Sequence, residues 1–473
     1  MKNLVKVSDY IAEFFAKRGV NKCFVVTGGG AMHLNDSFGH SSDIDCIYNH
    51  HEQGCSMAAE GYTRLTGKPA IVSVTSGPGT TNTVTGVLGA WLDSVPMIVL
   101  SGQMNFDTTI KSTPLPLRQL GFQEFNIVDS VQAMTKYAEM VTDPNYIAYH
   151  LEKALHLAES GRKGPVWLDI PLDVQSAKID PNDLIHYALP IDRNLVSEEV
   201  IDSVFDKLNE AKKPVLFVGY GVRMSNSYEA FLKAVDKLKI PVVTEWNSND
   251  LIWKDHDYYA GHAGTIGNRG GNFVVQESDL LIAVGCQFSI RQLSYRWENF
   301  APKAYKIAVD IDKYELIKPT IKIDQPINTT VDSFLEALNI STKVSSHSYD
   351  NKWNQWSREI NEKYPIVQEK HLKSKCPISI YAFFKSLSKR LESNDVVVLA
   401  NGAACVAGLQ AIDTKKGQRV FTNAGASSMG YGVAAAVGAA CAKENNEQVF
   451  CVEGDGSIQM NLQELQTIAH NNL

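Results

Sequence analysis

Short apolar runs, each followed by a small or polar residue, recur along almost the whole chain and limit what it can fold into. They are rich in Val and Ile, and segments with helical spacing of apolar residues separate them. The runs include NKCFVVTG, PAIVSVTSG, VPMIVLSGQ, GPVWLDIP, KPVLFVGYG, IPVVTEWN, DLLIAVGC, AYKIAVDID, DVVVLANG and EQVFCVEGDG. Strands that are buried on both faces have this composition, and with helices between them they predict parallel sheets in an α/β fold.

Two polar stretches divide the chain into three parts. Residues 176–195 are polar and marked by proline, and residues 341–375 are highly charged and poor in strand signals. We interpret both as linkers, the second with helical content. A chain of 473 residues is also long enough for about three domains at roughly 150 residues each. We therefore expect three doubly wound parallel-sheet domains, at 1–175, 190–340 and 376–473.

Composition and charge argue against several classes of protein. The 45 basic and 52 acidic residues give a net charge of −7 without a long basic run, which is a poor match to a nucleic-acid partner. No apolar stretch reaches the roughly 18 residues of a membrane span, and the nearest, 430–442, is short and made of small residues. Eight scattered cysteines without C-x-x-C spacing are typical of reduced thiols. We expect a cytoplasmic protein with no nucleic-acid and no membrane partner.

The strongest local signal is GDGS at 454–457, where a predicted buried strand ends and a helical pattern follows. Glycines let a backbone approach a ligand closely, and a helix N-terminus offers N–H donors to an anion. The carboxylate of Asp455 can hold a hard divalent cation that bridges to phosphate oxygens. A tight turn with Asp455 as the helix N-cap is the alternative.

A second candidate site lies near Glu52, at a predicted strand–helix transition beside two histidines. The turn TSGPG at 75–79 follows another strand, and Asn82 continues the helix after it. Taken alone, Glu52 is also explained as a carboxylate that stabilises a helix start. His50 and His51 have no third ligand at metal spacing, so a metal site there is not expected.

Together these motifs resemble the thiamine diphosphate-dependent enzymes, specifically the acetolactate (acetohydroxyacid) synthase large subunits. The resemblance rests on HEQG (51–54) and TSGPG (75–79) in the first part and GDGS (454–457) in the third. It extends through LDSVP (92–96), SGQ (101–103), GFQE (121–124), GPVWLDIP (164–171), VDID (309–312) and SMGYG (428–432). It covers nearly the full chain and is thinnest from about 320 to 390.

The resemblance implies thiamine diphosphate and Mg²⁺ as cofactors, with a pyrimidine-binding domain at 1–175, a central Rossmann-like domain at 190–340 and a diphosphate-binding domain at 376–473. Glu52 matches the catalytic glutamate that hydrogen-bonds the cofactor's pyrimidine, and Asp455 matches a magnesium ligand. Met429 matches the residue that bends the cofactor, with plain core packing as the alternative. The expected cofactor contacts are Gly77, Asn82, Ala403, Ala404, Ser427, Met429, Gly456 and Ser457. The synthases have a histidine and a glutamine in the loop of Ala403 and Ala404, so the chain departs from the pattern there.

The implied reaction is decarboxylation of pyruvate, or a related 2-keto acid, followed by carboligation of the acetyl unit. Phe122 and Gln123 match residues that line the synthase substrate pocket, and Arg291 matches a pocket arginine, although a surface arginine at a strand end is an equal alternative. Acetolactate formation would place the enzyme in branched-chain amino acid biosynthesis. Arg118-Gln119-Leu120 is more similar to carboligases that act on unusual sugars, so transfer onto a keto-sugar or another carbonyl stays open.

Two further expectations follow from the same resemblance. The synthases carry FAD in the central domain, and GYG at 219–221 follows a strand there, which leaves a flavoprotein and a flavin-free member equally open. The family places its active site between subunits, so we expect a homodimer or homotetramer.

The end of the chain also departs from the family pattern. The family completes the GDG motif about two dozen residues later with further metal ligands, whereas this sequence ends at Leu473. We therefore expect an incomplete diphosphate-binding domain that binds thiamine diphosphate and Mg²⁺ more weakly than a complete homologue and turns over pyruvate poorly. Whether the chain is a truncated, split or inactive homologue stays open.

Overall fold

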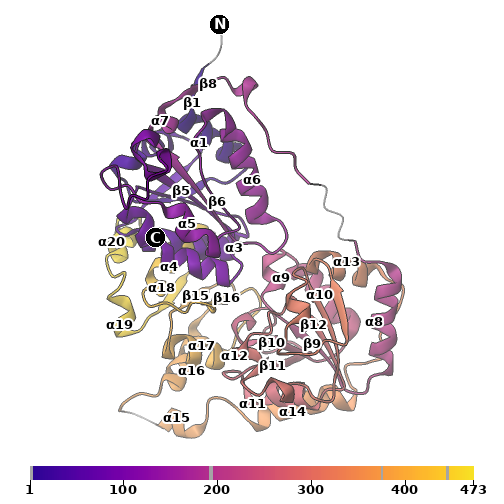
Figure 1. Cartoon of the computed structure of the whole chain (residues 1–473). Coiled ribbons are helices and arrows are strands. Elements are labelled where there is room, and N and C mark those ends of the chain that lie inside the picture. Colours follow the sequence, from indigo (N-terminus) through magenta and orange to yellow (C-terminus); the bar gives the residue numbers. More distant parts are fainter. Residues whose placement is uncertain (1–3, 191–194, 374–375, 444–446) are drawn as a thin grey trace. The chain divides into compact units, whose positions relative to one another are not determined.

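The computed structural model describes residues 4–190, 195–373, 376–443 and 447–473 (Figure 1). The chain packs as two units, one of Met1–Ile191 with Asn423–Leu473 and the other of Asp192–Thr422. Residues 191–194 and 374–375, which belong to the two predicted linkers, lie outside the described residues.

The first unit is built on a six-stranded sheet in the order β3-β2-β4-β5-β7-β6, and every pairing in it is parallel. Its strands are β2 (Lys22–Val25), β3 (Asp45–Tyr48), β4 (Ile71–Val74), β5 (Met97–Gln103), β6 (Tyr137–Met140) and β7 (Pro165–Pro171). The strand order reverses between β2 and β4, and a crevice for ligands forms at such a point, at the carboxyl ends of the strands. The predicted motifs around Glu52 and Gly77 follow β3 and β4 and so lie at this edge.

Helices cover both faces of this sheet because successive strand residues point to opposite sides. Cys23 and Val25 pack in a core with the helices α1, α2, α6 and α7, whereas α3, α4 and α5 pack on the opposite side. These helices are α1 (Val7–Lys17), α2 (Met32–His40), α3 (Glu52–Thr66), α4 (Pro78–Leu92), α5 (Ile127–Val131), α6 (Ile147–Glu159) and α7 (Leu172–Ser176). A two-stranded antiparallel pair joins β1 (Val5–Lys6) to β8 (Lys178–Ile179).

The C-terminal segment of the chain belongs to this first unit and packs on α3 (Figure 1). It contains α18 (Tyr431–Ala442), β17 (Val449–Val452), α19 (Asp455–Ile458) and α20 (Glu464–Asn471). Two glycines let α3 and α18 approach closely. A Cβ on Gly438 would lie 1.8 Å from the carbonyl oxygen of Ala58, and one on Gly61 would lie 2.2 Å from that of Ala435.

The second unit contains another six-stranded parallel sheet, in the order β11-β10-β9-β12-β13-β14. Its strands are β9 (Pro214–Val218), β10 (Val242–Glu245), β11 (Tyr259–Ala263), β12 (Leu280–Val284), β13 (Tyr305–Asp310) and β14 (Gln325–Asn328). Its helices are α8 (Glu198–Glu210), α9 (Gly221–Met224), α10 (Tyr228–Leu238), α11 (Arg269–Glu277), α12 (Ile290–Leu293), α13 (Val331–Ile340) and α14 (Lys352–Lys363). Two apolar cores, one on each face, hold α8, α10 and α13 on one side and α11 and α14 on the other.

The remaining part of this unit begins the third predicted sheet, in which β15 (Val396–Leu399) pairs in parallel with β16 (Arg419–Phe421). The helices beside these strands are α15 (Glu369–Lys373), α16 (Ile380–Arg390) and α17 (Ala403–Ala411). The structure therefore confirms the predicted fold class of three parallel-sheet α/β domains.

The described parts of the two polar stretches contain regular secondary structure and packing contacts. Within 176–195, Lys178 and Ile179 form the strand that pairs with β1. Within 341–375, the expected helical content is confirmed by α14 and α15. Trp353 of α14 packs in the core of the second unit, and its indole N–H donates to the carbonyl of Pro214 at 2.9 Å. The overall composition of these stretches is polar, so it does not predict contacts that only a few apolar residues make.

Candidate functional site

Glu52 is the first residue of α3, the helix that follows β3, and so lies at the strand–helix transition that the sequence predicts. His51 caps this helix, since its Nδ1 accepts the backbone N–H of Gln53 at 3.2 Å. The Glu52 side chain turns toward α4, where Asn82 Nδ2 donates to Glu52 Oε2 at 3.0 Å. The structure thus brings together Glu52 and Asn82, which lie 30 positions apart in the sequence.

The Gly77 turn meets the loop that carries Phe122 and Gln123. Gly77 has φ +58°, and a Cβ there would lie 2.5 Å from the carbonyl oxygen of Gln123. Gln123 itself has φ +58°, a backbone conformation that residues other than glycine seldom adopt. The Phe122 side chain is 81% exposed. Both predicted substrate residues therefore lie on a loop in contact with the Gly77 turn.

The GDGS turn and the SMG segment lie side by side. Ser457 Oγ accepts the backbone N–H of Gly430 at 2.9 Å, and a Cβ on Gly456 would lie 3.6 Å from Met429 Cε. Asp455 is exposed, and its Oδ1 accepts the N–H of Gly456 at 2.9 Å. Asp455, Gly456, Ser457 and Met429 are thus gathered at the start of α19, and Met429 is 42% exposed rather than in the core.

Two helices begin within or after GDGS, in agreement with the helical pattern that the sequence shows there. The short helix α19 ends at Ile458 and α20 begins at Glu464. Leu462 and Leu465, which give this segment its helical spacing of apolar residues, are exposed. The turn between the helices places Asn461, which is fully buried, so that its Nδ2 donates to the carbonyl of Gly430 at 2.9 Å.

A second buried side chain ties this turn to the start of α3. The carboxylate of Glu464 accepts from Asn49 Nδ2 at 2.8 Å and from the backbone N–H of His50 at 3.1 Å. The ring of His50 lies 3.0 Å from the hydroxyl of Thr467. His50 and His51 therefore serve in packing and capping, and in the described ranges no group of three His, Cys, Asp or Glu side chains could hold a metal ion.

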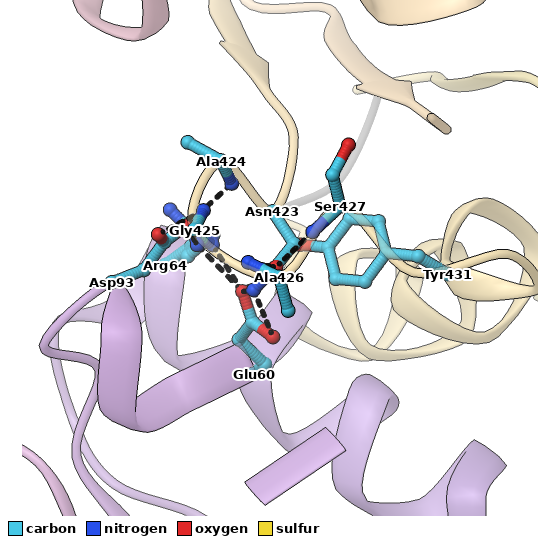
Figure 2. A network of polar contacts seen from close by, with 9 residues as sticks. All are labelled: Glu60, Arg64, Asp93, Asn423, Ala424, Gly425, Ala426, Ser427 and Tyr431. Carbon is cyan, nitrogen blue, oxygen red and sulfur yellow. Dashed lines mark hydrogen bonds and ion pairs between the residues drawn. The ribbon is translucent and has the colours of Figure 1, made fainter. Parts of the chain in front are cut away.

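A buried polar network holds the segment that leads to Met429, and Figure 2 shows it. Arg64 on α3 pairs with Glu60 one turn earlier, at 2.6 Å, and with Asp93 at the end of α4. Asn423 Nδ2 donates to both oxygens of Glu60, at 3.0 and 3.2 Å, and the Tyr431 hydroxyl donates to Oε1 at 3.3 Å. Burial raises the pKa of the Glu60 carboxyl, and the guanidinium of Arg64 opposes the rise.

The same network binds four successive backbone N–H groups. Asp93 accepts those of Ala424 and Gly425 at 2.8 and 2.7 Å, and Asn423 Oδ1 accepts those of Ala426 and Ser427 at 3.0 and 3.1 Å (Figure 2). Ser427 has φ +51°, a conformation that persists only where the surroundings fix it. Asp93 and Asn423, held by Arg64 and Glu60, thus position Ser427 and, two residues later, Met429. The sequence alone did not identify this network. The available signals were Asp93 in the LDSVP motif and the charges of Glu60 and Arg64, which stand four residues apart in a helix of small residues.

The remaining predicted residues lie in the second unit. Ala403 and Ala404 begin α17 after Gly402, which has φ +64°. Arg291 is an exposed residue of α12, and its guanidinium carbon lies 5.6 Å from the ring centre of Trp246. No helix in the described part of the chain is both long enough and apolar enough to cross a bilayer.

The parallel sheets, the turns at their carboxyl edges and the GDGS segment define the class of protein. Three family models match in order: "Thiamine pyrophosphate enzyme, N-terminal TPP binding domain" at residues 5–130, its "central domain" at 201–338 and its "C-terminal TPP binding domain" at 400–473. The chain belongs to the thiamine pyrophosphate enzymes.

Similar proteins narrow the class to relatives of acetolactate synthase. The chain is 32% identical to acetolactate synthase isozyme 1 large subunit of Escherichia coli, over 98% of this chain and 80% of that protein. It is also 32% identical to the acetolactate synthase large subunit of Lactococcus lactis, over 97% of this chain and 77% of that protein. Acetolactate synthase 2 of Nicotiana tabacum is 32% identical, with 99% of this chain and 69% of that protein covered.

Proposed function

We propose that this enzyme uses thiamine diphosphate and Mg²⁺ to decarboxylate pyruvate, or a related 2-keto acid, and to join the acetyl unit to a second carbonyl. The relatives named as acetolactate synthases support 2-acetolactate as the product. The observation that carries the proposal is the pair of Glu52 and Asn82 at the carboxyl edge of the first sheet, where one carboxylate oxygen is held by the amide.

The residues around GDGS fit a diphosphate and a cation. A Cβ on Gly454 would meet nothing nearer than Ser457 Cβ at 3.9 Å, and one on Gly456 nothing nearer than Met429 Cε at 3.6 Å, so only ordinary van der Waals contacts border the two glycines of this turn. The exposed carboxylate of Asp455 is an oxygen ligand of the kind Mg²⁺ prefers. Ser457 and Gly456 would contact the diphosphate, and the backbone of Ala403 and Ala404 is proposed to do the same.

Each residue then has a physical role. When bound, thiamine diphosphate supplies a carbon nucleophile and an electron sink for the decarboxylation. With the cofactor bound, the carboxyl group of Glu52 would hold and return a proton at a cofactor nitrogen, while Asn82 fixes the orientation of that carboxyl group. Gly77 lets the backbone approach the cofactor closely, and Ser427 and Met429 shape the site on the GDGS side.

Phe122 and Gln123 are proposed to contact the 2-keto acid, and Arg291 its carboxylate. The second candidate acceptor, a keto-sugar or another carbonyl, is favoured by one observation. The segment Arg118-Gln119-Leu120, which is unlike the biosynthetic synthases, is tied to the substrate loop. Gln119 Nε2 donates to the carbonyl of Glu124 and the Leu120 N–H to its carboxylate, both at 3.1 Å.

The other expectations remain proposals. They are the domain boundaries 1–175, 190–340 and 376–473, a homodimer or homotetramer with the active site between subunits, a cytoplasmic location and a role in branched-chain amino acid biosynthesis.

The test replaces Glu52 by Gln, which keeps the size and a hydrogen bond but removes the transferable proton. We expect pyruvate consumption to fall by about 10²-fold or more, with thiamine diphosphate binding by calorimetry little changed. Glu13→Gln, on an exposed face of α1, is the matched control and should leave the rate unchanged. Acetolactate and keto-sugar products are quantified in the same reactions. Unchanged pyruvate consumption in Glu52→Gln would refute the proposed role.

A further inference from the structure

A fully buried carboxyl group lies where β5 and β7 end, close to the predicted substrate loop. Asp169 of β7 pairs in register with Ser101 of β5. The Ser101 hydroxyl donates to Asp169 Oδ1 at 2.6 Å and Gln103 Nε2 donates to Oδ2 at 3.0 Å. Trp167 adds a third layer, because its indole N–H donates to Ser101 Oγ at 2.8 Å. SGQ and GPVWLDIP thus meet at one buried group that the proposed reaction does not use.

Gln103 connects this carboxyl group to the loop. Its Nε2 also donates to the carbonyl of Phe125 at 2.9 Å, and its Oε1 accepts the N–H of Met104 at 3.0 Å. The buried carboxylate of Glu124 closes the loop on itself by accepting the N–H groups of Ile110 and Leu120, at 3.2 and 3.1 Å. Gln103 is therefore a bridge from the sheet to residues 121–125, which include Phe122 and Gln123.

We propose that Asp169 and Gln103 are positioning residues for the substrate loop, which they hold in place when Asp169 is ionised and release when it is protonated. The proposal rests on the proposed function in one respect, namely that Phe122 and Gln123 bind the substrate.

The protonation state of Asp169 affects the loop through the hydrogen bonds that its carboxyl group accepts. An ionised carboxylate accepts from Ser101 and Gln103 at once, whereas a protonated one must also donate, and its protonated oxygen is a poor acceptor. Protonation of Oδ2 weakens the hold on Gln103 Nε2 and with it the contact to Phe125. Desolvation raises the pKa of Asp169 to about 7; hydrogen bonds from Ser101 and Gln103 and the charge of Lys111 oppose the rise, and Glu124 adds to it.

The first test uses the full chain without added cofactor and takes Trp167 as the reporter. The fluorescence difference between wild type and Trp167→Phe isolates this indole, and we expect it to change with pH around 7 as one group. Asp169→Asn should remove the transition, whereas Asp143→Asn, an exposed carboxylate, should keep it. An unchanged transition in Asp169→Asn, or none in the wild type, overturns the proposal.

Hydrogen exchange of amides 105–125 tests the loop directly. After correction for intrinsic rates, exchange should be faster at pH 6 than at pH 8 in the wild type. Gln103→Met removes the bridge and leaves the Ser101 contact, so exchange should be fast at both pH values. This variant also serves if Asp169→Asn fails to fold. Equal protection at both pH values in the wild type overturns the proposal.

The third measurement separates positioning from packing. The KM for pyruvate should rise about tenfold from pH 8 to pH 6, as the ionised fraction of a group with pKa near 7 falls by about that factor. The rise should be absent in Asp169→Asn and Gln103→Met, and kcat should change less than KM. A loop that loosens with a KM that stays constant overturns substrate positioning. Absence of pyruvate turnover in the wild type refutes the proposed function instead, and the fluorescence and exchange results still stand on their own.

Discussion

Removal of Arg64 tests whether the buried network beside Met429 holds its loop by charge. Arg64→Leu deletes the single guanidinium that pairs with both Glu60 and Asp93. The side chains of the three residues are 2%, 1% and 6% exposed. Loss of one partner from a buried ion pair leaves an uncompensated buried charge and costs about 3–5 kcal/mol. We expect the free energy of unfolding to fall by about that amount at pH 8.

Two factors decide where in the range of about 3–5 kcal/mol the loss of stability in Arg64→Leu falls. They are the hydrogen-bond donors that remain to Glu60 and Asp93, and the pH. Asp93 keeps the N–H groups of Ala424 and Gly425, and Glu60 keeps Asn423. Burial already raises the pKa of Glu60, and without Arg64 it rises further. A native state with a raised carboxyl pKa binds more protons than the unfolded chain, so stability falls as pH increases above the unfolded pKa near 4.5. The loss should therefore be smaller at pH 6 than at pH 8.

Urea unfolding followed by circular dichroism at both pH values measures these changes. Lys17→Leu is the matched control, because Lys17 pairs with Glu13 at the same helical spacing on an exposed face, where such a pair contributes less than about 0.5 kcal/mol. The double variant Glu60→Gln with Arg64→Leu should recover part of the loss at pH 8, since position 60 then carries no charge. Equal losses in Arg64→Leu and Lys17→Leu would refute the reasoning.

Two further predictions concern packing and pH in each unit separately. Gly438→Ala should destabilise the first unit by about 3 kcal/mol, because the new Cβ would overlap the Ala58 carbonyl oxygen. The control is Gly29→Ala, whose Cβ would have nothing within 4 Å and should change stability by less than about 0.5 kcal/mol. Similar losses for both variants in urea unfolding would contradict the tight contact of α3 with α18. In the second unit, burial raises the pKa of Glu245 to about 8, so the free energy of unfolding should fall by up to about 1.4 kcal/mol per pH unit from near pH 5 to pH 8. Glu245→Gln should flatten this dependence on pH. The same slope in the wild type and the variant would contradict the prediction.

Much of the fold could be predicted because each buried strand is a short run of apolar residues in the sequence. The run VPMIVLSGQ contains β5, whose seven residues are all buried, and GPVWLDIP contains β7, which pairs with it. The start of a helix also has a local sequence signal, since Glu52 follows a strand and a capping residue. The positions of Glu52, Gly77 and Asp455 at the ends of strands could therefore be predicted from one sequence.

The contacts that position these residues could not be predicted, because their partners are far apart in the chain. Asn423 and Glu60 are 363 positions apart, and Asn49 and Glu464 are 415 apart. A charged residue in a helix of small residues indicates only that something pairs with it. Likewise, the spacing of Leu462, Leu465 and Ile468 predicts a helix but not the turn that places Asn461 under Gly430.

Two of the loops that carry proposed site residues of the first unit are held in the same physical way. Each leaves regular structure, so its backbone N–H or C=O groups need partners that no helix or strand supplies. Asp93 and Asn423 supply them for residues 424–427, and Gln103 and Glu124 for residues 110–125. In both places a buried carboxyl group with a raised pKa stands behind the anchor, Glu60 in one and Asp169 in the other. Protonation of such a group removes part of its capacity to accept hydrogen bonds from its partners, so we expect the geometry of the proposed site to depend on pH through residues that never touch the substrate.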